Sequence, residues 1–178
     1  MQSKNGQTAR SEPTLALGAI SKMGSRVAVL EDRRMNNRLT LLYLFLSGLL
    51  LLGIGLAILL APHSIYASNG IVLGDDPSLL SEIRAPGGFL TASSILILLG
   101  TFRRFLRSVA IALTVLVYGS FGLARLVGLA LDGLPAAGLV GSTAIELIVA
   151  AIGLLILWRS GATRSGTAAA RRQAPGAL

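Results

Sequence analysis

The sequence predicts an all-α membrane protein, a four-helix transmembrane bundle with both termini cytoplasmic. Of the 178 residues, 53% are apolar and only 13% are charged, against about 25% charged residues in an average soluble domain. The apolar residues gather in four runs, each close to the roughly 20 residues that a helix needs to cross a bilayer core. The basic residues flank these runs, as the positive-inside rule describes.

The first element is a polar and basic segment, residues 1–38, without a sustained helical or strand period. Such a composition favours a disordered arm. Met35, in the sequence MNNRLTLLYLF, is an alternative translation start. With that start the residues before Met35 are not part of the protein. Both starts leave the apolar runs intact.

The first expected span is Leu39–Ala61, which carries no charge and is followed by Pro62. A secretory signal peptide is the alternative, but its apolar core would have about 7–15 residues and would lie near the N-terminus. This run is longer and begins later. We therefore expect an uncleaved membrane anchor.

The second expected span is one kinked helix over Pro77–Phe102. Asp76 and Pro77 are typical of a helix start, with Asp as N-cap and Pro in the first turn. Pro86 should kink the helix because its ring displaces the carbonyl four residues earlier. The apolar part after Pro86 is near the lower length limit for a span, so a continuous helix from Pro77 solves the length problem.

Two further spans follow a basic turn at Arg103–Arg107. They are Ser108–Leu131 and Ala136–Trp158, joined by a turn of sequence DGLP. Residues 159–178 form a Gly-, Ala- and Arg-containing tail that we expect to be disordered. The chain is thus divided into an arm at 1–38, a transmembrane bundle at 39–158 and a tail at 159–178.

The charge distribution predicts the orientation and the partners. An even number of spans places both termini on one side, and the arm, the turn and the tail carry most of the 16 basic residues. That side is expected to be the cytoplasm, in the inner (plasma) membrane of a cell. The net charge of +8 therefore predicts contact with the lipid bilayer and its anionic headgroups, and not with nucleic acid.

The inventory of reactive side chains argues against an enzyme. The chain has no cysteine and one histidine, which argues against thiol chemistry and against zinc or haem sites. Ser93 and Ser94 have no His/Asp partner in the pattern, and phosphate-binding loop motifs are absent. We expect no catalytic residue, no metal and no cofactor.

Two charged residues inside the apolar runs are the strongest functional signals. Glu146 lies roughly 15 Å into the fourth span and Arg125 roughly 9 Å from the outer end of the third. The short turn between these spans makes them neighbours. An ion pair between Arg125 and Glu146 is therefore predicted, because it offsets the cost of inserting each charge.

This pair is expected to belong to a larger polar cluster that opens outward and holds a ligand or a partner. The alternative is a salt-bridge network that only fixes the helix register. The members are Glu82, Arg84, Arg125 and Glu146, with Asp132 at the edge, and small residues should pack beside them: Gly87, Gly88, Gly122 and Ser142.

Three short motifs carry a resemblance to a known family. SEIRAPGG enters the second span, GLARLVGLALDG closes the third, and AIEL lies in the fourth. Over 39–158 the chain resembles an uncharacterised bacterial four-span membrane family, domain of unknown function family 4345, and more distantly the DoxX-like membrane proteins. Pro86 departs from the bulkier residue of the family pattern. The matching polar positions are Glu82, Arg84, Gly88, Arg125, Asp132, Gly133 and Glu146.

The function expected from these features is binding without catalysis. The outward cluster would take a small amphiphile or a partner helix, from another membrane protein or a second copy. The likeness to DoxX-like proteins implies, by analogy, an alternative role as an accessory subunit of a redox complex that handles quinones or thiols. A second alternative is a small oligomeric transporter, which the Pro86-Gly87-Gly88 interruption of a helix would favour.

Overall fold

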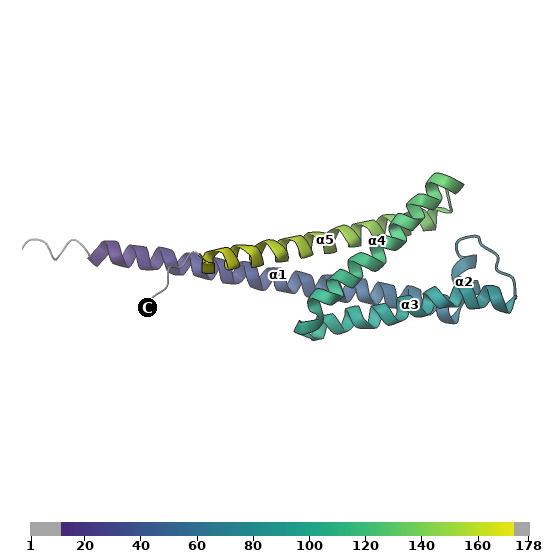
Figure 1. Cartoon of the computed structure of the whole chain (residues 1–178), viewed down its shortest axis with the longest axis horizontal. Coiled ribbons are helices and arrows are strands. Elements are labelled where there is room, and N and C mark those ends of the chain that lie inside the picture. Colours follow the sequence, from purple (N-terminus) through teal and green to yellow (C-terminus); the bar gives the residue numbers. More distant parts are fainter. Residues whose placement is uncertain (1–11, 173–178) are drawn as a thin grey trace, which may run out of the picture. The chain divides into compact units, whose positions relative to one another are not determined.

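The computed structural model describes the backbone of residues 12–172 and the side chains of residues 35–159. The elements are α1 (Glu12–Leu60), α2 (Pro62–Ala67), α3 (Pro77–Phe102), the short 3-10 helix η1 (Arg104–Leu106), α4 (Arg107–Asp132) and α5 (Ala137–Arg172), as Figure 1 shows. The chain divides into two units, Met1–Thr40 and Leu41–Leu178, and α1 contributes to both.

The predicted fold class is confirmed. Four helical segments are long and apolar enough to cross a membrane: Met35–Leu60, Pro77–Phe102, Arg104–Asp132 and Ala137–Arg159. The described residues contain helices and connecting turns but no strand. The protein is therefore a multi-pass membrane protein with an all-helical transmembrane region.

Two helices are longer than the expected spans. α1 begins at Glu12 and α5 continues to Arg172. Residues 12–38 and 159–172 are therefore helical, although their sequences predict irregular chain. The reason is local: Pro13 stands in the first turn of α1, where proline is tolerated, and no later proline interrupts either helix. Residues 1–11 and 173–178 of the expected arm and tail lie outside the described residues.

α3 spans the range expected from the sequence. The Asp76 carboxylate accepts a hydrogen bond of 2.9 Å from the Leu79 backbone N–H, which caps the first turn. Pro77 follows in the first helical position, and Pro86 lies inside the helix without ending it. The helix is thereby long enough to span the bilayer although its apolar part is short.

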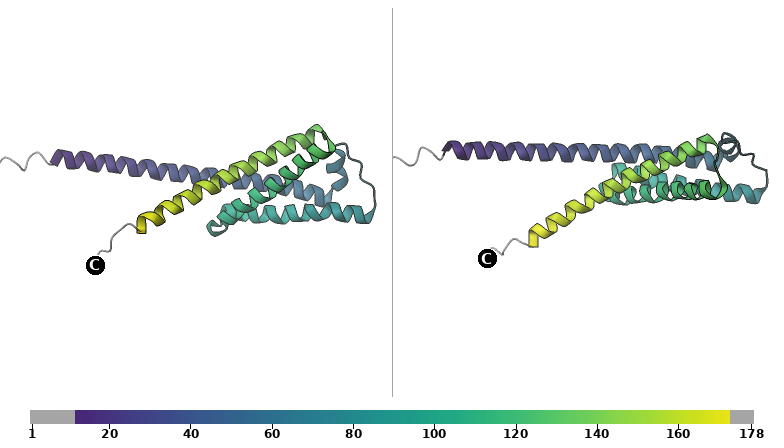
Figure 2. Two further views of the ribbon diagram at one scale, coloured as in Figure 1. Left: turned by 45° about the horizontal axis from the view of Figure 1, so that its top comes forward. Right: turned by 90° about the horizontal axis from the view of Figure 1, so that it is seen from above.

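The part of α1 after Thr40 contacts three other helices. The Tyr118 hydroxyl of α4 donates to the Ser47 carbonyl at 2.6 Å, and the Tyr43 hydroxyl donates to the Val149 carbonyl of α5 at 2.9 Å. α4 packs against both α3 and α5 (Figure 2). The buried apolar core lies on α1, α3 and α4: Leu44, Leu51, Leu90, Ile97, Ala110, Ile111, Val117 and Tyr118.

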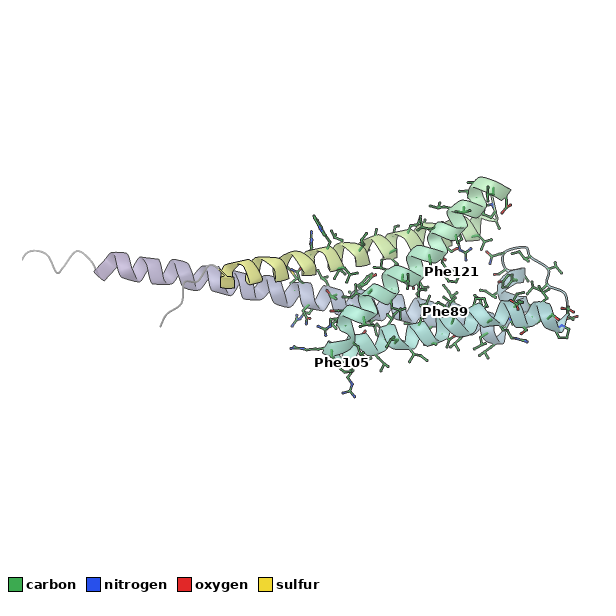
Figure 3. The ribbon with its side chains drawn as sticks, viewed as in Figure 1. Phe89, Phe105 and Phe121 are labelled. Atoms are coloured by element: carbon green, nitrogen blue, oxygen red, sulfur yellow. The ribbon has the colours of Figure 1, made fainter. Side chains whose placement is uncertain are left out.

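Outside this core, large apolar side chains cover the helices, as a lipid-facing surface requires. Phe89 and Phe105 are exposed, and Phe121 is half-buried; Figure 3 shows their places on α3, on η1 and on α4. α5 contributes no fully buried apolar residue within the described side chains. It packs mainly along α4, and partly buried side chains such as Val149 and Ile156 lie against the core.

Glycines allow α1 and α3 to approach closely. A Cβ atom at Gly55 would lie 2.7 Å from the Thr91 backbone nitrogen and 3.1 Å from the Gly87 carbonyl oxygen. Both are backbone atoms, which cannot move aside without separating the helices. A Cβ at Gly53, two residues earlier on the same helix, would meet no atom within 4 Å.

Alanine substitution at these two glycines tests the close approach. Gly55→Ala should lower the free energy of unfolding by roughly 1–3 kcal/mol because α1 and α3 must move apart. Gly53→Ala, the matched control, should leave stability unchanged or slightly raised, because alanine favours a helix over glycine. Thermal unfolding of both variants in the same detergent is the measurement, and equal melting temperatures would contradict the packing.

Candidate functional site

The site lies between α4 and α5, which a tight turn makes antiparallel neighbours. α4 ends at Asp132, and Gly133 follows with φ of +92°, a left-handed conformation that glycine adopts without strain. This turn lets α5 start at Ala137 and run back along α4. Arg125 on α4 and Glu146 on α5 thereby come to the same level.

The two charged groups form the predicted ion pair. Arg125 Nε lies 3.2 Å from Glu146 Oε2. The N–H of Nε is not aligned for a hydrogen bond, and neither of the two atoms has another hydrogen-bond partner. The attraction is therefore mainly electrostatic, in a low-dielectric setting where such attraction is strong.

The two sides of the pair differ in exposure. The Glu146 side chain is 12% exposed, whereas that of Arg125 is 35% exposed. The Glu146 side chain is thus largely enclosed in the bundle, and the Arg125 side chain is partly exposed at its surface. A guanidinium has five N–H donors, so it can accept a further partner while it neutralises Glu146.

Gly122 makes room for Glu146 beside α4. A Cβ at this buried position would lie 2.8 Å from Leu147 Cδ2 and 3.4 Å from Glu146 Cβ. The absence of a side chain therefore lets α5 approach at the level of the ion pair, as is typical of helix pairs in membranes. Ser142, one turn before Glu146, donates its hydroxyl to the Leu139 carbonyl of its own helix at 2.9 Å.

The other predicted members of the cluster do not join the pair. Glu82, Arg84 and Asp132 are exposed, and none of the three belongs to the Arg125–Glu146 pair. Gly87 packs against Leu59 and Ile58 of α1, and a Cβ at Gly88 would meet nothing within 4 Å. The structure therefore brings together Arg125 and Glu146, with Gly122 as the packing residue, and leaves the α3 positions apart from them.

Two contacts were not foreseen from the sequence. His63 Nε2 lies 3.2 Å from Asp75 Oδ1 in the connection between α1 and α3. Tyr43 donates to the Val149 carbonyl of α5, and a Cβ at Gly153 would collide with the Tyr43 hydroxyl and lie 2.6 Å from Val115 Cγ2. Gly153, a glycine within an apolar run, is the sequence feature that could have indicated a close contact at this level of α5.

The chemistry available at the site is that of its two charged side chains. Among the described residues no group of three His, Asp or Glu side chains could hold a metal ion. The Arg125–Glu146 pair offers N–H donors and a carboxylate held close to each other. What it can do chemically is recognise acceptor oxygens that approach from the membrane side.

The comparisons with known proteins give one finding. A family model described as a domain of unknown function (DUF4345) matches residues 39–158, a range that contains the second and third spans, most of the first and fourth, and the ion pair. Searches of curated proteins and of solved structures find no match to this chain.

A double-mutant cycle measures the energy of the pair. Arg125→Gln and Glu146→Gln should each lower the free energy of unfolding by roughly 1–3 kcal/mol, because each leaves one charge without its counter-ion. The double variant should lose less than the sum of the two. Arg84→Gln removes an exposed charge on α3 and should change little. Strict additivity of the two single effects in detergent unfolding would show that the side chains do not interact.

Proposed function

Since this chain belongs to the DUF4345 family, whose description assigns no activity, we propose its function from the geometry of the spans: it binds a small amphiphile or a partner helix at the Arg125–Glu146 pair and catalyses no reaction. The observation that carries the proposal is the unequal burial of the pair. The Glu146 side chain is 12% exposed while the Arg125 side chain is 35% exposed.

A purely structural ion pair would be arranged differently. Charges that only fix a helix register are most favourable when both are enclosed and hydrogen-bonded. Here the Nε–Oε2 contact does not have hydrogen-bond geometry, and the Arg125 side chain stays 35% exposed. An arginine in this state within a membrane bundle favours a partner that supplies the missing acceptors.

The position in the bilayer suits an amphiphile. Arg125 is seven residues before the end of α4 at Asp132, so its Cα lies roughly 10 Å from that end. A long side chain can reach from this depth to the level of the headgroups. An amphiphile bound here would place its polar group at Arg125 and its apolar part beside Phe121, which lies one turn deeper on the same face of α4 and is half-buried.

The proposal includes an orientation in the plasma membrane, with both termini in the cytoplasm. Arg103, Arg104 and Arg107 lie at the α3–α4 connection, whereas Asp75, Asp76, Glu82 and Asp132 lie at the opposite ends of these helices. The positive-inside rule assigns the basic end to the cytoplasm, where it would contact anionic headgroups. Arg125 would then serve the outer leaflet.

Cysteine labelling tests the orientation cleanly, because the chain has no cysteine of its own. Gly74→Cys lies in the exposed connection before α3, and Phe105→Cys lies at η1, where the phenylalanine is 79% exposed. A membrane-impermeant maleimide should label Gly74→Cys in intact cells and Phe105→Cys only after permeabilisation. The reverse pattern would contradict the orientation.

Native mass spectrometry tests the binding itself. The wild-type protein, extracted with its surrounding lipid, should retain a bound small molecule or protein partner, and Glu146→Gln should lose it because the guanidinium is no longer held in place. Glu82→Gln, an exposed carboxylate on α3, is the matched control and should retain it. Equal occupancy in wild type and Glu146→Gln would overturn the proposed function.

A further inference from the structure

One face of α4 carries a cation and an anion with an open position between them. Arg125, Gly128 and Asp132 follow one another at helical spacing, so they lie on the same side of the helix. A Cβ at Gly128 would meet only Asp132 Oδ2, at 3.8 Å. The Asp132 carboxylate thus leans back over the glycine, toward the turn that carries Arg125.

Neither end of this face is saturated by the protein. The Arg125 side chain pairs with Glu146, with Nε 3.2 Å from Oε2, and remains 35% exposed. Asp132 is exposed and has no ion-pair partner among residues 35–159. A donor group and an acceptor group are therefore both available on a surface only two helical turns long.

The order of the charges along the helix is informative. Arg125 is the deeper group, and Asp132 stands at the end of α4, nearer to water. A glycerophospholipid with a zwitterionic headgroup presents its charges in the complementary order, with the phosphate closer to the acyl chains and the ammonium farther out. A guanidinium can bind phosphate through two parallel N–H donors, and a carboxylate can pair with an ammonium.

The net charge of the site separates zwitterionic from anionic lipids. Arg125 contributes one positive charge, and Glu146 and Asp132 contribute two negative charges. A lipid with a net negative headgroup would meet an excess of negative charge, whereas a zwitterionic headgroup supplies a cation for Asp132. Phe121, one turn deeper than Arg125 on the same face of α4 and half-buried, offers apolar surface for the acyl chains.

We propose that the Arg125–Gly128–Asp132 face of α4 binds a zwitterionic phospholipid from the membrane, with its phosphate on the Arg125 guanidinium and its ammonium beside Asp132. This inference rests on the proposed function and names the class of amphiphile that the site takes. Gly128 is part of the site because a larger side chain would fill the space between the two charged groups.

The test uses the full chain, delipidated in detergent and titrated with phosphatidylethanolamine or phosphatidylglycerol of the same acyl composition. Native mass spectrometry gives the bound fraction of each lipid. The wild type should prefer phosphatidylethanolamine by about fivefold, the contribution of one accessible ion pair. Asp132→Asn should abolish this preference while it retains binding of both lipids. Glu82→Gln, the control, should keep the wild-type preference.

Arg125 variants distinguish the location of the binding site from the class of lipid that it binds. Arg125→Gln should lose both lipids, and Arg125→Lys, which keeps the charge opposite Glu146 and so protects the fold, should bind both severalfold more weakly. If Arg125→Lys and Arg125→Gln bind both lipids like the wild type, the proposed site itself is wrong. If the Arg125 variants lose lipid but Asp132→Asn keeps the wild-type preference, or the wild type prefers phosphatidylglycerol, the zwitterionic assignment alone is overturned.

Discussion

The ion pair between Arg125 and Glu146 is the interaction on which the arrangement of the last two spans depends. A charge within the bilayer is costly unless an opposite charge meets it, so neither residue can leave the α4–α5 interface alone. Their contact fixes the level at which α5 runs past α4. Two glycines make this alignment of α4 and α5 possible. Gly122 lets the two helices approach closely, and Gly133, in a left-handed conformation, forms the turn between them.

Beyond the ion pair, α5 is attached by a hydrogen bond from Tyr43 and by partly buried apolar side chains that pack against the core. Apolar side chains gain little by leaving lipid for a helix interface, so packing of small residues and hydrogen bonds must hold transmembrane helices together. α5 buries little of its apolar surface. Instead Tyr43 of α1 donates to its Val149 carbonyl, and Gly153 accommodates the tyrosine ring. Two polar contacts about one helical turn apart, at Glu146 and at the Val149 carbonyl, therefore help to position the helix that bears the buried carboxylate.

Much of the fold follows from the sequence because the bilayer imposes simple rules. The length of an apolar run and the capping pair Asp76-Pro77 were sufficient to predict α3 with its observed bounds. The Arg125–Glu146 contact was predictable because a buried charge needs a partner and a short turn leaves one neighbour. Glu82 and Arg84 were predicted to lie beside the pair because all four residues lie toward the same end of the transmembrane helices. The observed position of Glu82 and Arg84 depends on how α3 packs, which no local sequence rule specifies. The Tyr43 contact joins residues that are far apart in sequence, and for the same reason it was not foreseen.

The central claim is that Arg125 and Glu146 are in contact within a lipid bilayer, and a distance measurement tests it most directly. Solid-state NMR with 15N-labelled arginine and 13C-carboxyl-labelled glutamate, in phospholipid bilayers, detects short N–C distances by dipolar dephasing. A glutamate carboxyl signal should dephase at a rate that matches the 3.2 Å Nε–Oε2 contact, and Glu146→Gln should abolish this signal. The absence of dephasing, or its survival in Glu146→Gln, would contradict the account.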